Sequence, residues 1–293
     1  MNHTRSIAIN ILIITSMLTS AFVGAVERSL IIGSEILGKD VLYSVYLPSG
    51  YEDSARSYPV VYALHGAGGY ENYFLDNGFQ STLDRLIESK QIPPLIVIMP
   101  DGQRSRYINN YDNTVRYEDF FFDELIPEIE LKFRVISSKQ SRAVAGTSMG
   151  GYGSMVYAMK RPDMFAASVS VGGSFCEGER IDNMSIDEWN DSTRGAVYGF
   201  DLDVSDRLTD HYKAHDPCFI IEDNNSLELT SVGLYMDCGD DDFRNDGNAR
   251  LHMLMRKYSI QHEYRVGNGA HDWEYFGPHM EQGLIYIASK FDD

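Results

Sequence analysis

The feature that most constrains this chain is an apolar run that leads directly into a glycine-rich turn. Residues 142–153 read Arg-Ala-Val-Ala-Gly-Thr-Ser-Met-Gly-Gly-Tyr-Gly, so Gly146 and Gly150 lie two positions before and two after Ser148. A serine held at the tip of a very tight strand-to-helix turn leaves room only for small side chains at those two positions. The helix that follows would direct backbone N–H groups toward a negative charge formed beside the serine. The pattern therefore predicts a nucleophilic serine.

A second apolar run also ends in glycines. Residues 60–64 are Val-Val-Tyr-Ala-Leu, and His65-Gly-Ala-Gly-Gly follows them. Such a loop lets a backbone N–H approach a substrate closely, so we predict an oxyanion hole formed by the N–H groups of Ala67 and Met149. His65 lies at the end of the strand and is expected to be structural. Neither loop carries the Gly-Lys-Ser/Thr sequence of a phosphate-binding loop, which argues against a nucleotide site.

The nucleophile needs a base and an acid, which are expected after later strands in the order Ser, Asp, His. His271 follows the last apolar run and is the candidate base. A series of aspartates follows the run before it, where Asp242 is the preferred acid, Asp241 the second choice and Asp240 the third. A calcium loop is another interpretation of these acids, but Arg244 would then occupy a ligand position of an EF-hand. We expect no metal and no cofactor.

The rest of the chain alternates short apolar β-branched runs with helical patterns. Several runs are continuously apolar, as expected for strands that are covered on both faces. This order predicts an α/β fold with a mostly parallel sheet and helices on both sides. Ser29–Leu37 and Val41–Leu47, separated by residues 38–40, predict an antiparallel hairpin at one edge. The other predicted strands are Val60–Leu64, Leu95–Met99, Arg142–Ala145, Ala167–Val171, Val232–Met236 and Glu263–Val266, and the predicted helices are Phe79–Lys90, Tyr117–Phe133, Gly150–Met159, Asn248–Tyr258 and Glu281–Phe291.

Two segments fall outside this alternation. Residues 174–231 are far longer than an ordinary crossover and are interpreted as a lid inserted over the working edge of the sheet. At the N-terminus, a short basic start, an apolar run and small residues that end at Ala25 predict a secretory signal peptide over residues 1–25. We therefore expect one domain over residues 26–293, in a secreted or periplasmic protein with no membrane insertion after cleavage.

Charge and cysteine content limit the partners and the cross-links. The net charge of −18 argues against nucleic acid and anionic membrane surfaces, because both require clustered Lys and Arg. Three cysteines in an oxidising compartment allow one disulfide, and Cys176 with Cys218 is the pair to test because both fall in the same irregular stretch. Cys238 closes an apolar run and is expected to be a buried small hydrophobe. Three unpaired cysteines are the alternative.

These motifs together resemble the putative-esterase group of the α/β-hydrolase superfamily. The group includes esterase D and S-formylglutathione hydrolase, the feruloyl and acetyl-xylan esterases of carbohydrate esterase family 1, siderophore esterases and mycolyltransferases. The resemblance implies an α/β-hydrolase fold, the triad Ser148, Asp242 and His271, and an oxyanion hole at Ala67 and Met149. The segments that carry it are the N-terminal hairpin with residues 46–51, and residues 64–69, 100–102, 147–153 and 269–273.

The choice among members of this group rests on charge and on the leader. A signal peptide argues against a cytosolic glutathione thioester as substrate. The predicted lid is acidic, which favours neutral or phenolic esters over a polyanionic siderophore. Candidate aromatic walls of the site are Tyr70, Tyr107, Trp189 and Trp273. The acids of the predicted lid are Glu177, Glu179, Asp182, Asp187, Glu188, Asp191, Asp201, Asp203 and Asp206.

We thus expect a secreted serine esterase that acts through an acyl-enzyme on feruloyl or acetyl esters of plant polysaccharide. A trilactone-siderophore esterase and a general short-chain acyl esterase are the alternatives within the group. A catalytically silent polysaccharide-binding protein of the same fold is the alternative from another class. The oligomeric state is left open.

Overall fold

The computed structural model of this chain describes residues 23–223 and 228–291. The first 22 residues of the predicted signal peptide, 1–25, lie outside the described residues, so export stays a prediction. Within the two described ranges, no helix combines the length and the apolar character that a membrane crossing requires.

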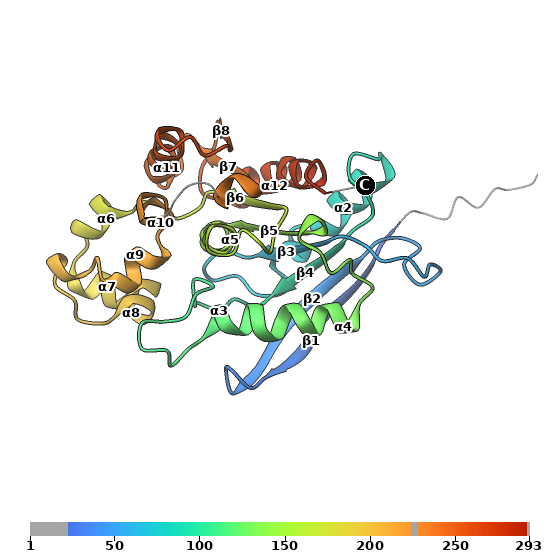
Figure 1. Cartoon of the computed structure of the whole chain (residues 1–293), viewed down its shortest axis with the longest axis horizontal. Coiled ribbons are helices and arrows are strands. Elements are labelled where there is room, and N and C mark those ends of the chain that lie inside the picture. Colours follow the sequence, from blue (N-terminus) through green and yellow to red (C-terminus); the bar gives the residue numbers. More distant parts are fainter. Residues whose placement is uncertain (1–22, 224–227, 292–293) are drawn as a thin grey trace, which may run out of the picture.

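One sheet of eight strands runs through the centre of the molecule (Figure 1). The strand order is β1-β2-β4-β3-β5-β6-β7-β8, in which β1–β2 and β2–β4 are antiparallel and the other neighbours are parallel. This mostly parallel sheet with a hairpin at one edge confirms the predicted fold class. The strands are β1 (Ala25–Ser34), β2 (Lys39–Leu47), β3 (Val60–Leu64), β4 (Ile96–Pro100), β5 (Arg142–Thr147), β6 (Ala167–Val171), β7 (Gly233–Gly239) and β8 (Glu263–Gly267).

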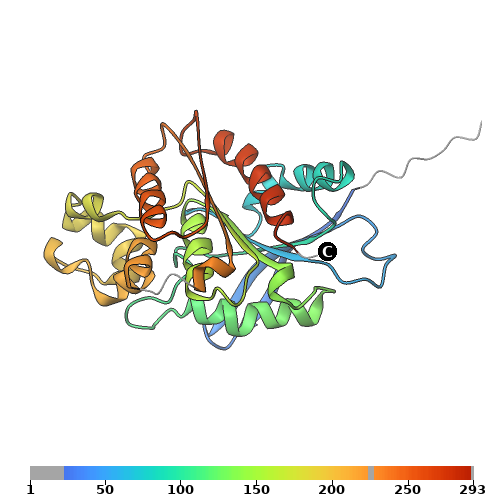
Figure 2. The same ribbon diagram turned by 45° about the horizontal axis from the view of Figure 1, so that its top comes forward.

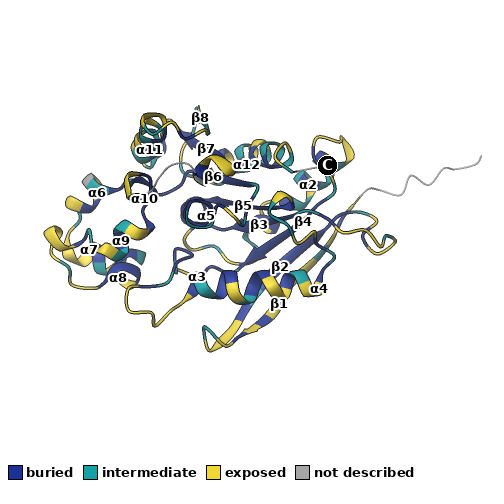
Figure 3. Cartoon of the chain, viewed as in Figure 1, coloured by how far each residue is buried: buried dark blue, intermediate teal, exposed yellow. Residues whose placement is uncertain are grey.

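Helices cover both faces of the sheet (Figure 2). Consecutive strand residues therefore enter different cores. Tyr62 belongs to the core beneath α4 (Ile126–Lys132) and α5 (Met149–Lys160), whereas Ala63 belongs to the core beneath α2 (Phe79–Glu88) and α12 (Trp273–Ala288). Because both faces are covered, the inner strands are buried along their whole length (Figure 3). One face carries α1 (Tyr73–Asp76), α2 (Phe79–Glu88) and α12 (Trp273–Ala288), and the other carries α3 (Tyr117–Phe120), α4 (Ile126–Lys132), α5 (Met149–Lys160) and α11 (Asn245–Lys257).

The hairpin turn differs from the prediction. Lys39 pairs with Ser34 and Asp40 pairs with Gly33, so the strands are joined by residues 35–38 rather than by residues 38–40. Lys39 and Asp40 at the start of β2 are exposed to solvent beside the edge strand β1, so their charges stay hydrated.

The last helix also differs, since α12 begins at Trp273 and not at Glu281. Its N-cap is Asp272, whose carboxylate accepts a hydrogen bond from the N–H of Tyr275 at 3.1 Å. Pro278 lies inside the helix and hides this start in the sequence, because proline normally interrupts helices. The predicted helix 117–133 exists, but Phe121–Leu125 forms a π-helical turn within it.

The predicted lid, residues 174–231, leaves the sheet at the carboxyl end of β6 and folds as a group of short helices. Figures 1 and 2 place α6 to α9 of this group together at one end of the molecule. That this segment acts as a lid stays a prediction. Its described α-helices are α6 (Gly178–Asp182), α7 (Ile186–Asp191), α8 (Thr193–Tyr198), α9 (Asp210–His215) and α10 (Pro217–Asp223), and it also contains 3₁₀ turns at Val204–Asp206 and Glu228–Ser231.

A disulfide between Cys176 and Cys218 ties the start of this insertion to α10, with the two Cα atoms 5.6 Å apart. The suggested pairing is therefore confirmed, and Cys238 is free and buried as expected. Asp216 lies with the two sulfurs in a group whose ligand atoms are within 4.8 Å of one another. Because both sulfurs are consumed by the disulfide, this group is not suited to a metal ion.

Candidate active site

The turn between β5 and α5 holds Ser148 in a strained backbone conformation, with φ 54° and ψ −112°. Small neighbours are a steric requirement here. A Cβ atom on Gly146 would lie 2.3 Å from the Gly150 backbone, and a Cβ atom on Gly150 would lie 1.9 Å from the carbonyl oxygen of Leu64. The strand–turn–helix inferred from the sequence is therefore present, and it presents the Ser148 hydroxyl at the carboxyl edge of the sheet.

Three of the predicted site residues form a hydrogen-bonded row. His271 Nε2 lies 2.8 Å from Ser148 Oγ, and His271 Nδ1 lies 2.7 Å from Asp242 Oδ2. Asp242 is buried, whereas the alternatives Asp241 and Asp240 are exposed and make no contact with His271. With Nδ1 protonated and donating to Asp242, Nε2 is free to accept the serine proton, which is the arrangement of a nucleophile with its base and acid.

Three residues around this row were missed by the sequence reasoning. The His271 ring packs between Phe243 and Phe276, with ring centroids 4.6 Å and 4.9 Å away. Gly172 has φ +62°, and a Cβ atom there would lie 3.0 Å from Asp242 Oδ2. A glycine pair directly after the strand β6 was the available signal for Gly172, whereas the two phenylalanines carry none, since their role depends on where their rings point.

The loop after β3 lies against the nucleophile, since a Cβ atom on Gly66 would lie 3.2 Å from Ser148 Cβ. His65 supports this loop, as expected. Its Nδ1 lies 2.8 Å from the carbonyl oxygen of Gly66, and its Nε2 accepts a hydrogen bond from the N–H of Gly102 at 2.8 Å. In the described chain, neither the N–H of Ala67 nor that of Met149, the first residue of α5, donates a hydrogen bond to another residue. Both groups are thus free for an oxyanion, and that role stays a prediction.

The prediction that four aromatic side chains line the site is wrong for Tyr107 and Trp189. Tyr107 and Trp189 are completely buried. The Tyr107 hydroxyl donates to the carbonyl oxygen of His65, and the Trp189 indole N–H donates to the carbonyl oxygen of Gly199. Both side chains therefore serve the core, because a buried ring with a satisfied polar atom has nothing left to offer a substrate.

The other two aromatic residues are accessible to solvent. Tyr70 is 46% exposed, and its hydroxyl donates to Asp76 at 2.7 Å. Trp273 is partly buried and packs edge-on against Tyr73 and Phe74. A role in substrate binding stays a prediction for both.

Among the described acids of the predicted lid, none forms a hydrogen bond or an ion pair with His271, so the expected repulsion of anionic substrates is not supported by a direct contact. Of the described side chains in that set, only Glu177 is buried, and it is surrounded by Arg106, Arg194 and Arg244. The others point to solvent. A net charge summed over a segment does not report which side chains face the site.

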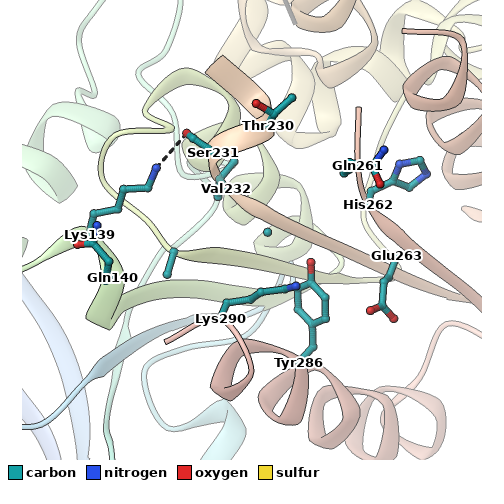
Figure 4. Close-up of a pocket in the computed structure, with 12 residues that line it drawn as sticks. Lys139, Gln140, Thr230, Ser231, Val232, Gln261, His262, Glu263, Tyr286 and Lys290 are labelled. Carbon is teal, nitrogen blue, oxygen red and sulfur yellow. Dashed lines mark hydrogen bonds between the residues drawn. The ribbon is translucent and has the colours of Figure 1, made fainter. Parts of the chain in front are cut away.

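A hollow of about 600 Å³ lies on another part of the surface, away from Ser148 and His271 (Figure 4). It opens between the amino ends of β6, β7 and β8, where Lys139 donates to the hydroxyl of Ser231 at 2.9 Å. Ligands of open parallel sheets bind at the carboxyl ends of the strands, which is where Ser148 and His271 lie. This hollow is therefore not the active site.

Burial raises the pKa of the Cys238 thiol, and the adjacent negative charge of Asp242 acts in the same direction. The thiol is thus held protonated beside the triad carboxylate, which removes it as a competing nucleophile.

Comparison with known proteins supports the resemblance to the putative-esterase group. A sequence model of the family described as Putative esterase matches residues 34–287. An esterase of Mycobacterium tuberculosis is 38% identical over 134 residues, which cover 44% of this chain and 28% of that protein. The endo-1,4-beta-xylanase/feruloyl esterase of Xylanibacter ruminicola is 33% identical over 163 residues, which cover 52% of this chain and 22% of that protein.

The chain therefore spans less than a third of the length of these two relatives. Among solved structures, a ferulic acid esterase superposes with a TM-score of 0.77 and 28% identity, over 92% of this chain and 100% of that one. The family model covers most of the chain, and the fold matches over nearly all of it. This protein belongs to the family described as Putative esterase, within the α/β-hydrolases.

Proposed function

We propose that this chain is a serine esterase that hydrolyses carboxylic esters through an acyl-enzyme. The observation that carries the proposal is the row Ser148–His271–Asp242, with 2.8 Å and 2.7 Å between the partners, beside a loop with free N–H groups. Family membership supports the same reaction class.

In the first half of the reaction, Ser148 Oγ attacks the ester carbonyl carbon while its proton passes to His271 Nε2. The N–H groups of Ala67 and Met149 hold the negative oxygen of the tetrahedral intermediate. His271 returns the proton to the alcohol oxygen as the C–O bond breaks. Asp242 stabilises the imidazolium in between, which leaves an acyl-Ser148 ester.

In the second half, water replaces the alcohol. His271 removes a proton from that water, which attacks the acyl carbon, and the proton then returns to Ser148 Oγ as the serine leaves. The products are the free acid and the free alcohol, and the enzyme is regenerated. No metal or cofactor is needed for any of these steps.

For the substrate, we propose feruloyl or acetyl esters of plant polysaccharide, met outside the cytoplasm after removal of the leader. The similarity to a xylanase/feruloyl esterase and to the structure of a ferulic acid esterase supports this choice. A panel of methyl ferulate, acetylated xylan, tributyrin and a trilactone siderophore tests it. Hydrolysis of the siderophore alone would refute it.

The test of the reaction itself is Ser148→Ala. We expect a loss of about 10⁴-fold or more in kcat on 4-nitrophenyl acetate, because the covalent step disappears. A fluorophosphonate probe should label the wild type and not the variant. If Ser148→Ala keeps full activity, or if the wild type takes up no probe, the chain is not a serine esterase and a silent binding protein becomes the better explanation.

A further inference from the structure

A second cavity lies one side chain away from the catalytic histidine. It measures about 340 Å³ and lies between α6 and the start of α11. Phe243 separates it from the active site, because the ring of Phe243 contacts the ring of His271 on one side and lines this cavity on the other. The guanidinium carbons of Arg180 and Arg244 lie 4.9 Å and 4.8 Å from the centre of the same phenylalanine ring.

The charged side chains that line this cavity are mostly arginines. Arg180, Arg244 and Arg250 line the cavity together with Glu177 and Asp246. Arg180 and Arg250 are exposed, so their guanidinium groups are accessible from the solvent.

The carboxylate of Glu177 in this lining is in contact with, or close to, three guanidinium groups. Arg194 Nη2 contacts both carboxylate oxygens of Glu177 at 2.5 Å, Arg244 contacts one of them, and Arg106 Nη2 lies 3.9 Å away. Arg106 and Arg194 are each less than a tenth exposed, and the Nε atom of each has no hydrogen-bond partner among the described residues. The cluster therefore holds two more positive charges than negative ones.

The other nearby compensation is weak. Arg106 lies over the ring of Tyr152, 4.1 Å from its centre, which offers a cation–π contact but no counter-charge. Two further buried carboxylates lie nearby, and both have other hydrogen-bond partners. Asp216 accepts the N–H groups of Cys176 and Cys218 and the hydroxyl of Tyr212. Asp242 accepts the backbone N–H of Arg244 and lies against His271.

Two of the arginines in this cluster are less easily charged than usual. Burial, and next the charge of Arg106, lower the pKa of Arg194 to about 10 and that of Arg244 to about 9. Both side chains still carry their charge at neutral pH. An excess of buried positive charge is costly unless an anion completes it.

We propose, on the basis of the esterase function above, that this arginine-lined cavity binds a carboxylate carried by the ester substrate, on either its acyl or its alcohol part. The guanidinium groups of Arg180, Arg244 and Arg250 present planar donor pairs that match the two oxygens of a carboxylate. Only the ring of Phe243 lies between the cavity and His271, so a substrate that extends past this ring can place a carboxylate in the cavity while its ester bond lies at Ser148. On this proposal, the ester that the enzyme cleaves also carries a carboxylate, although the protein as a whole is acidic.

Two pairs of esters test the proposal. For the acyl part, 4-nitrophenyl hydrogen succinate is compared with 4-nitrophenyl acetate. For the alcohol part, 4-acetoxybenzoate is compared with its methyl ester. In the wild type, we expect added NaCl to lower kcat/KM for the charged ester of at least one pair and to leave its neutral partner unaffected. The pair that responds identifies the part that carries the carboxylate.

The variant is the double substitution Arg180→Gln with Arg250→Gln, which removes two exposed guanidinium groups and leaves the contacts of Glu177 in place. The charged-to-neutral ratio of kcat/KM should fall by about tenfold relative to the wild type, a comparison that cancels the intrinsic reactivity of the esters. Arg256→Gln is the matched control, since Arg256 is an exposed arginine of α11 that does not line the cavity. Its ratio should equal that of the wild type.

The two proposals fail in different ways. If the wild type hydrolyses none of the four esters, the esterase function is wrong. If it hydrolyses them but the ratio in the double variant equals that of Arg256→Gln, the esterase function stands and the carboxylate site is overturned. A lowered melting temperature with an unchanged ratio would mean that the arginines only anchor the inserted helices.

Discussion

Replacing Asp242 by Asn, with Asp241→Asn as matched control, tests the geometry of the row at the active site. Asp242 has no free oxygen: Oδ1 accepts the N–H of Arg244 at 2.8 Å, and Oδ2 lies 2.7 Å from His271 Nδ1. An asparagine that keeps the bond to that N–H must turn its NH₂ group toward His271. Nδ1 then has to accept a proton instead of donating one, so Nε2 carries the proton and can no longer take one from Ser148.

The expected loss follows from this change of tautomer. In serine hydrolases the equivalent exchange lowers kcat by about 10⁴-fold, which corresponds to about 5.4 kcal/mol of transition-state stabilisation. Asp241 is exposed, and its N–H donates to the carbonyl oxygen of Gly269, a backbone bond that asparagine retains. Asp241→Asn should therefore change kcat by no more than about twofold.

The assay is kcat on 4-nitrophenyl acetate for both variants, with thermal unfolding followed by circular dichroism to establish that each is folded. The rate of fluorophosphonate labelling should fall in parallel with kcat, because the probe needs the same activated serine. Equal kcat values for the two variants, or a larger loss in Asp241→Asn, would refute the assignment of Asp242 as the residue that orients His271.

Three further predictions concern the scaffold. Replacing Cys176 and Cys218 by Ser removes a cross-link between residues 42 apart, so the free energy of unfolding in urea should fall by about 4 kcal/mol, and a loss under about 1 kcal/mol would contradict it. The raised pKa and burial of Cys238 predict no reaction with a thiol reagent in the native protein and one thiol after unfolding without reductant; rapid native labelling would contradict this. Gly150→Ala places Cβ 1.9 Å from the carbonyl oxygen of Leu64 and should yield little folded, active protein. Gly178→Ala is the control and should be tolerated, because nothing lies within 4 Å of the added Cβ. Equal yields of the two variants would show that the turn can relax.

Local pattern was sufficient for the parts of the fold in which each residue's role depends on near neighbours. The strands at 60–64 and 167–171 are at their predicted positions, since uninterrupted apolar runs suit strands covered on both faces. The start of α12 was missed because Pro278 hides a helix whose stability comes from packing against the sheet.

Among the site residues, too, some could be recognised from local sequence and others depend on the fold. The glycines stand two residues before and two after Ser148, so this local spacing could be recognised from the chain alone, although part of its steric cause, the carbonyl oxygen of Leu64 against Gly150, belongs to another strand. The choice of Asp242 over two neighbouring aspartates could not be settled that way, because it depends on which carboxylate the turn after β7 directs inward. The sequence also misplaced Tyr107, which the fold buries completely.

The chemistry of this protein was thus determined by its sequence, and the surroundings of that chemistry by its tertiary structure. A nucleophile, a base and a set of candidate acids are visible as residue types at the ends of strands. Their distances, the burial of Asp242 and the meeting of three arginines at Glu177 arise only when segments far apart in the chain pack together. Summed along the chain, the charges indicated an acidic lid. Packing instead turns most of those acids to solvent and gathers arginines beside His271, because side-chain direction is decided by the fold.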